Sequence, residues 1–314
     1  MHARAVTSAL WAVSFALVFV DGAEATPDIT SNGRAQPAAS AAPAATPRNV
    51  SVPPTPEEDC QCSAASRTPP RTRSVGWPWH GRLRNGVRLR PSDTLRFMHV
   101  DRPRGNFYGT PALVGLLQRV AQRVDVLMPG ARLNVGELSK RGGGNIVGHR
   151  SHENGRDVDL GFYVKDQTGM PVETRAFVNM DRRGIGRLGA DEDSEESGEI
   201  FFDDVRNWLM METLATDPEV VVQFAFVHRD IRHRLLETGR RLGASNELLA
   251  KVERVVISPG VRHPHRNHFH VRIYCAASDV PECKDRGPYW PWLATSHPFA
   301  QRIVPLRGWP PEPD

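Results

Sequence analysis

The sequence predicts an α+β fold, in which helices flank a small and mainly antiparallel sheet. Predicted strands and helices follow one another along residues 76–287 without the regular strand–helix–strand alternation of a parallel sheet. No internal repeat and no change of composition divides this stretch into two cores. Glycine and proline supply 26 residues each of the 314, which indicates many loops between short elements.

Four helices are expected. The first begins at Thr110-Pro111, where an N-cap residue precedes a proline, and it ends before Pro129-Gly130. Asp203 or Asp204 caps the second, which carries Trp208 at a spacing typical of a core residue. The other two are expected at 229–242 and 246–256.

Short apolar runs predict the strands of the sheet. Between the first two strands lies a glycine-rich turn at 142–144, and the Gly-, Asp- and Glu-rich residues 181–199 are interpreted as an exposed loop. The strands are expected at 132–135, 158–164, 219–227 and 268–274.

The N-terminus has the pattern of a secretory signal over residues 1–25. Arg4 precedes an apolar run from Ala9 to Val20, and small residues precede a cleavage site expected after Ala25. A helix of this run spans about 18 Å, short of the roughly 30 Å core of a bilayer, so we expect no membrane span in the mature chain. The protein is therefore expected to be periplasmic or otherwise exported.

Three further segments follow the signal. Residues 26–75 contain nine prolines and nine alanines and are interpreted as a linker, 76–287 as the folded domain, and 288–314 as a Pro/Trp-rich tail. Cys275 and Cys283 are expected to form a disulfide, whereas the pairing of Cys60 and Cys62 is left open. The sequence also leaves open whether the tryptophans of the tail pack on the domain or bind a partner; these are Trp290, Trp292 and Trp309.

The charge pattern argues against a nucleic-acid partner. The formal net charge is only +4, and the basic residues are spread along the chain without a dense stripe or a recognition motif. A mean hydropathy of −0.43 likewise excludes a bundle of membrane helices. The sequence does not indicate an oligomeric state.

Metal-binding side chains concentrate in two windows, 148–159 and 263–272. Strand periodicity places His268 and His270 on one face of the last predicted strand, and Asp157 and Asp159 on one face of an earlier strand. Gly155 allows the chain to turn, so that a histidine of the first window approaches these aspartates. Five of the twelve histidines lie at the core of these windows: His149, His152, His265, His268 and His270.

Two histidines and one aspartate form the ligand pattern of a catalytic zinc site, which leaves a fourth position for water. A further histidine beside the ligands can act as general base or stabilise the oxyanion, a role that suits His268. Alone, a His-x-His pair is more often a surface pair, and Asp-x-Asp is more often a turn or a calcium cluster. Their occurrence together favours zinc, and the spacing leaves Asp157 and Asp159 as alternatives.

These motifs resemble the penicillin-insensitive murein endopeptidases, a zinc peptidase family in the group that includes lysostaphin, D-Ala-D-Ala carboxypeptidases and the hedgehog signalling domain. The similarity covers roughly residues 88–284. It is carried by Gly142-Gly143-Gly144, Gly148-His149-x-x-His152, Gly155-Arg156-Asp157-Val158-Asp159, Phe202-Asp203, Arg206-Asn207-Trp208 and His265-x-x-His268-Phe269-His270-Val271-Arg272, followed by Cys275.

The resemblance implies a D,D-endopeptidase that hydrolyses D-alanyl–meso-diaminopimelyl cross-links of peptidoglycan through a zinc-activated water. It implies one zinc ion held by His152, Asp159 and His270, with His268 as the catalytic histidine. It implies that His149 and His265 contact substrate or support the ligands. The chain departs from the family at Asn267, where an acidic residue is expected, and in its long linker and tail.

Two other functions fit the same residues. A D,D-carboxypeptidase would use the same zinc site but release terminal D-alanine rather than split cross-linked dimers. A non-catalytic peptidoglycan-binding module would keep the fold and the metal without hydrolysis.

Overall fold

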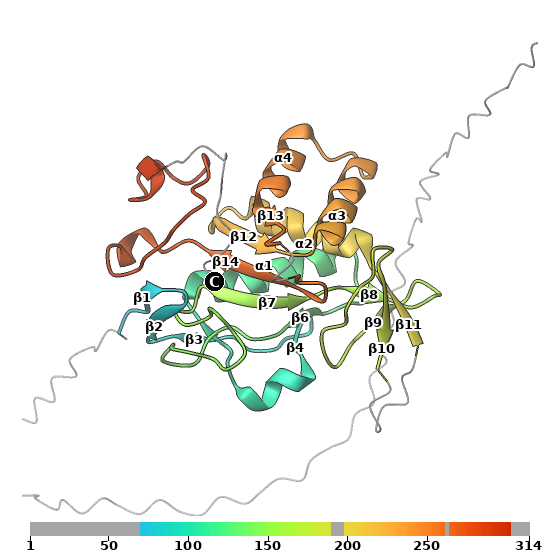
Figure 1. The fold of residues 1–314 in the computed structure, drawn as a ribbon, viewed down its shortest axis with the longest axis horizontal. Coiled ribbons are helices and arrows are strands. Elements are labelled where there is room, and N and C mark those ends of the chain that lie inside the picture. The colour runs from blue at the N-terminus through green and yellow to red at the C-terminus, as the bar shows by residue number, and fades with distance from the viewer. Residues whose placement is uncertain (1–69, 190–197, 261–263, 303–314) are drawn as a thin grey trace, which may run out of the picture. The chain divides into compact units, whose positions relative to one another are not determined.

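A six-stranded sheet runs through the fold of this protein (Figure 1). The computed structural model describes residues 70–189, 198–260 and 264–302, all of them within one unit that spans residues 65–314. The predicted signal, Cys60, Cys62, Trp309 and most of the predicted linker lie outside the described residues. In the described part of the chain, no helix is both long and apolar enough to cross a membrane.

The central pairings of the main sheet are antiparallel. The β12–β14, β14–β7 and β7–β6 pairings run antiparallel, and the outer β13–β12 and β6–β4 pairings run parallel. This arrangement confirms the predicted α+β class. In spatial order the strands are β13 (Val256–Ile257), β12 (Val222–Phe226), β14 (His268–Ile273), β7 (Asp157–Gly161), β6 (Leu133–Val135) and β4 (Leu95–Phe97).

All four expected helices are present. The Thr110 hydroxyl accepts a hydrogen bond from the Leu113 N–H, and the Asp203 carboxylate accepts one from the Arg206 N–H, so both predicted caps are confirmed. Trp208 is 1% exposed and belongs to the core, as its spacing predicted. The helices are α1 (Pro111–Leu127), α2 (Asp204–Thr216), α3 (Arg229–Arg241) and α4 (Asn246–Val255).

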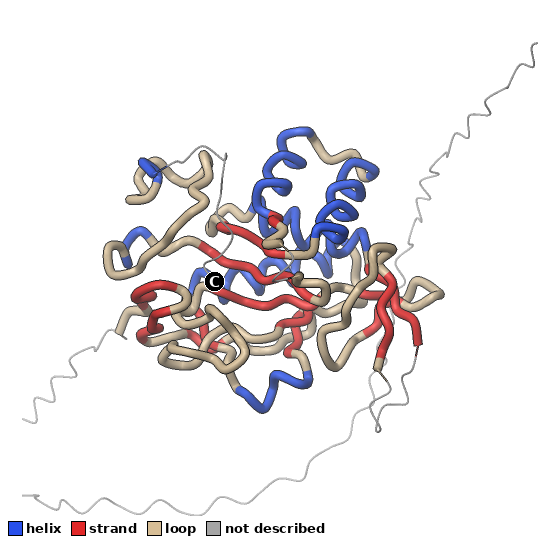
Figure 2. The backbone as a smooth tube through the Cα atoms, viewed as in Figure 1, coloured by secondary structure: helices blue, strands red, loops and turns tan. Residues whose placement is uncertain are grey.

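The two faces of β14 have different roles. Phe269, Val271 and Ile273 join the core that also contains the buried residues of α1 and α2. These two helices lie behind the sheet in Figure 1 and in the coloured tube of Figure 2. The period of two along a strand therefore turns His268 and His270 away from the helices.

A second sheet replaces part of the exposed loop predicted at 181–199, so that prediction is wrong for β10 and the start of β11. The only buried residue of β10 is Gly186, so the strand lacks the apolar alternation that would reveal it. The strand predicted at 158–164 is also interrupted, because β7 ends at Gly161. The sheet order is β10 (Ile185–Leu188), β11 (Gly198–Phe202), β8 (Val164–Lys165) and β9 (Pro171–Val172).

The ends of the described chain pack on the domain. The disulfide predicted between Cys275 and Cys283 is present. Beside it Trp290 is 2% exposed in a second apolar cluster, and its ring stacks on Trp292 at 5.4 Å, so both rings pack on the domain. The remaining elements are β1 (Arg73–Trp77), β2 (His80–Arg84), β3 (Val87–Arg88), β5 (Tyr108–Gly109), and the 3-10 helices at His99–Arg104, Ala277–Asp279 and Ala300–Arg302.

Alanine substitutions at two helical glycines are expected to have opposite effects on the stability of the fold. A Cβ at Gly239 would lie 2.3 Å from the buried ring of Trp208, so we expect Gly239→Ala to destabilise the fold by about 1–3 kcal/mol. A Cβ at Gly115 would meet only the end of the Arg119 side chain, so Gly115→Ala should stabilise by up to about 1 kcal/mol. Urea unfolding measures the change in the free energy of unfolding for each variant. Changes of the same sign would contradict the close packing of α2 on α3 at Gly239.

Candidate active site

A hollow of about 260 Å³ lies over the face of β7 and β14 that is turned away from the helices. All six residues predicted to form a site line it, although they come from three separate stretches of the chain. The lining residues are Gly148, His149, Arg150, Ser151, His152, Asp159, His265, His268 and His270.

The register of β7 against β14 pairs the charged side chains. His270 lies directly opposite Asp159, and Arg272 lies directly opposite Asp157. Opposite residues on an antiparallel pair have adjacent side chains on the same face. The strand pairing therefore brings residues more than 100 positions apart into contact.

His152 reaches this pair from the turn before β7. Gly155 has φ +78°, as the predicted turn requires, and His152 itself has φ +75°, a left-handed conformation that few non-glycine residues adopt. Its ring is 1% exposed, and Nδ1 lies 2.7 Å from the Leu138 carbonyl oxygen. Nδ1 therefore donates to that carbonyl, which leaves Nε2 as an acceptor in the hollow.

Three potential ligand atoms converge there. His152 Nε2 lies 3.2 Å from His270 Nδ1 and 3.4 Å from Asp159 Oδ1, and the latter two atoms are 3.0 Å apart. A second set, His149, His152 and Asp159, has its ligand atoms within 4.8 Å of one another. Two imidazole nitrogens and one carboxylate oxygen suit zinc, so either donor set fits a catalytic zinc ion.

Asp157 and Asp159 have different surroundings. Asp157 Oδ1 accepts a 2.5 Å hydrogen bond from Arg272 Nε and lies 3.2 Å from His270 Nε2, and Asp157 Oδ2 accepts one from the His152 N–H. The ion pairs of Asp159, within the described residues, are all with histidines. Asp157 therefore orients the two histidines from beneath, whereas Asp159 faces the hollow.

His149 is held in place by Glu137, a residue that no motif in the sequence indicated. Glu137 Oε2 lies 2.7 Å from His149 Nε2, and the same carboxylate accepts hydrogen bonds from Asn106 and pairs with Arg104. Glu137 follows a short strand and belongs to no motif, so no signal in the sequence identifies it. Arg272 lies within the second window, two residues after His270 and therefore on the same face of β14.

His268 is held on two sides. Its Nδ1 lies 2.7 Å from Asn267 Oδ1, which accepts the hydrogen bond, and its ring stacks on Phe177 with the centroids 4.8 Å apart. Its Nε2 lies 3.6 Å from Asp159 Oδ1, and the ring of His265 is 5.1 Å away. Asn267 thus acts as a neutral acceptor. No spacing in the sequence indicated Phe177.

Burial and charge set the protonation of these groups. Burial lowers the pKa of His268 to about 4, although the Asp159 carboxylate opposes the shift. Burial alone would lower the pKa of His270, but hydrogen bonds with Asp157 and Asp159 outweigh it and raise that pKa to about 10. Arg272 and His270 hold the pKa of Asp157 below its usual range despite burial, and the histidines around Asp159 lower the pKa of that carboxyl in the same way. At neutral pH the carboxylates are therefore ionised and His268 is neutral.

The sequence comparison decides the family. Residues 74–291 match the sequence profile of the penicillin-insensitive murein endopeptidases. The chain belongs to this family. The matched stretch contains every residue of the hollow and is wider than the 88–284 inferred from the motifs.

Relatives of the murein endopeptidase family show low identity over long alignments. A Haemophilus influenzae protein named penicillin-insensitive murein endopeptidase is 26% identical over 204 residues, 65% of this chain and 64% of the relative. A protein of the same name from Escherichia coli O157:H7 is 26% identical over 196 residues, 62% of this chain and 63% of the relative. The match thus spans less than two thirds of the length of either relative.

The Asp157–Arg272 pair predicts a large loss of stability when it is broken. The side chains are 0% and 5% exposed, so Arg272→Met leaves a buried carboxylate without its cation and should destabilise the fold by about 3–5 kcal/mol. Arg183→Met breaks an exposed pair with Asp181 and should change stability by less than about 1 kcal/mol. Urea unfolding compares the two; similar losses would show that burial of the first pair does not matter.

Proposed function

We propose that this chain is a zinc-dependent murein D,D-endopeptidase, which hydrolyses the D-alanyl–meso-diaminopimelyl cross-link of peptidoglycan. The convergence of three donor atoms of His152, Asp159 and His270 within 3.4 Å carries the proposal. It occurs in a hollow open to solvent, beside a fourth histidine, in a member of the penicillin-insensitive murein endopeptidase family. The names of the relatives support murein as the substrate.

His152, Asp159 and His270 are the proposed zinc ligands. His152 and Asp159 belong to both candidate donor sets, and His270 is preferred over His149 as the third ligand because its Nδ1 contacts both other donor atoms. Its Nε2 then bonds Asp157, an arrangement that orients metal-binding histidines. When bound, zinc lowers the pKa of a water ligand toward neutrality and polarises a carbonyl group.

His268 is the proposed catalytic proton carrier. Asn267 holds a proton on its Nδ1, so Nε2 is free to take up a proton from the attacking water and to deliver it to the leaving amine. Phe177 fixes the plane of the ring by stacking on it. His149 and His265, at the rim of the hollow, are proposed to contact substrate, and Glu137 holds His149 in place.

The rest of the chain is proposed to serve delivery to peptidoglycan. Residues 1–25 are a signal removed near Ala25, residues 26–75 a linker, 76–287 the peptidase domain and 288–314 a C-terminal tail. A peptidoglycan substrate and the apolar N-terminal run both support export to the periplasm or beyond.

A mass-spectrometric digest of purified cross-linked muropeptide dimers and of monomers tests the reaction. We expect dimers to be split into intact monomers, the activity to be lost with a zinc chelator, and added zinc to restore it. Release of terminal D-alanine from monomers without splitting of dimers would indicate a D,D-carboxypeptidase instead. Zinc bound at one equivalent without any cleavage would indicate a non-catalytic binding module.

Two histidine variants separate metal binding from proton transfer. His152→Ala removes a ligand, so we expect loss of stoichiometric zinc and of activity together. His268→Ala should keep the zinc and lower kcat by about 10²–10⁴-fold. Zinc content by atomic absorption and turnover of dimers measure both effects. His233→Ala, an exposed histidine on α3, is the control and should match the wild type; full activity in His268→Ala would contradict its role.

A further inference from the structure

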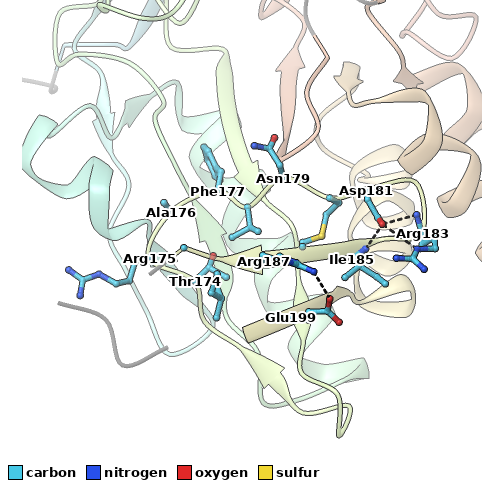
Figure 3. Close-up of a pocket in the computed structure, with 15 residues that line it drawn as sticks. Thr174, Arg175, Ala176, Phe177, Asn179, Asp181, Arg183, Ile185, Arg187 and Glu199 are labelled. Carbon is cyan, nitrogen blue, oxygen red and sulfur yellow. Dashed lines mark hydrogen bonds and ion pairs between the residues drawn. The ribbon is translucent and has the colours of Figure 1, made fainter. Parts of the chain in front are cut away.

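A second cavity, of about 700 Å³, is larger than the hollow of the candidate active site, and Figure 3 shows its lining residues. One wall is the segment from Thr174 to Asp181, and the other is the edge strand β10 with Glu199 of β11. None of the six residues predicted to form the active site lines this cavity. It therefore requires a separate explanation.

Phe177 connects the cavity with the active site. Its side chain lines the cavity, and its ring stacks on His268. Gly136 and Gly161 make room for this ring, because a Cβ at these positions would lie 2.5 Å and 3.3 Å from Phe177 atoms. On the same wall, the Met180 N–H donates to the Arg266 carbonyl, two residues before His268. A ligand in the cavity can therefore contact Phe177, which itself contacts His268.

Unpaired main chain borders the cavity on one side. Among the described residues, the backbone N–H and C=O groups of residues 176–179 make no hydrogen bond, and none of these residues is helical or has a positive φ. Opposite them, β10 pairs with β11 on one side only and is the edge of its sheet, although the Ile185 N–H and C=O groups are already bonded to Asp181. Free backbone groups such as those of residues 176–179 can recognise an extended peptide by main-chain hydrogen bonds.

The side chains of the cavity suit small residues and carboxylates. Ala176, Val178 and Ile185 are apolar, and Gly186 allows close packing, because a Cβ there would lie 2.8 Å from Val178. Arg187 faces the cavity and pairs at 3.3 Å with Glu199, an exposed contact that a ligand carboxylate can replace. Arg175, by contrast, extends away from the other lining residues in Figure 3.

We propose that this cavity is a subsite for one stem peptide of the cross-linked substrate, an extended peptide of small residues with free carboxylates. Residues 176–179 supply its main-chain partners, and Arg187 binds a carboxylate. The inference rests on the proposed murein endopeptidase function, to which it adds the position of the substrate relative to His268.

Kinetics of the full chain with cross-linked muropeptide dimers test the subsite. Asn179→Trp places a ring in the cavity from an exposed position, and Arg187→Gln removes the cation. Each should raise KM about tenfold with kcat within about twofold of the wild type, since neither residue touches the hollow. Arg182→Trp and Arg182→Gln are matched controls, because Arg182 is exposed on the next turn and does not line the cavity. Both controls should match the wild type.

Binding without cleavage separates this inference from the proposed reaction. A fluorescein-labelled stem tetrapeptide that ends in diaminopimelyl-D-alanine is titrated against the chain by anisotropy. Its Kd should rise about tenfold in Asn179→Trp and in Arg187→Gln, and an analogue with one N-methylated amide should bind about tenfold more weakly to the wild type.

Each outcome decides between the two proposals. Unchanged KM and Kd in variants that melt like the wild type would overturn the subsite, whether or not dimers are cleaved. Absence of dimer cleavage by the wild type, together with peptide binding that the cavity variants weaken, would overturn the endopeptidase reaction and support the subsite. Absence of both cleavage and peptide binding would overturn both.

Discussion

The antiparallel register of β7 against β14 is the constraint on which the rest of the site depends. It sets His270 opposite Asp159 and Arg272 opposite Asp157, while the alternate residues of β14 enter the core. A slip of one residue would turn the core residues toward solvent and the histidines toward α1 and α2. Burial of the apolar face of β14 therefore also fixes the register of its polar face, so the packing that forms the core also positions the site residues.

The same register gives each buried carboxylate of β7 a partner on β14. Two carboxylates sit beneath and within the hollow, and each is stable there because it has its own partners. Arg272 neutralises Asp157 permanently, which lets Asp157 orient two histidines. The Asp159 carboxylate forms ion pairs only with imidazoles among the described residues. No permanent cation in this described part of the chain neutralises it, so it can interact with a metal ion or with a protonated histidine. Adjacent aspartates on one strand face thus have distinct roles.

The second sheet contributes to the larger cavity next to Phe177. In residues 176–179, before β10, the backbone groups make no hydrogen bond among the described residues, and this segment contains Phe177, which contacts His268. A peptide substrate needs contacts along its length as well as at the bond that is cut, because positioning of the reacting bond supplies much of the rate. The family relationship covers both sheets, since the matched residues run from 74 to 291.

The sequence alone determined the features that depend on local pattern. The helix caps at Thr110 and Asp203, the separation of faces along residues 268–274 and the disulfide follow from spacing, and the structure bears them out. The motifs also identified the family, and they named the residues that the structure gathers in the hollow. Strand β10 was missed because its one buried residue is a glycine. Tertiary structure alone decided the partners of these residues: Arg272 with Asp157, Glu137 with His149 and Phe177 with His268. These partners come from elements far apart along the chain, and only the packing of one element on another brings them into contact.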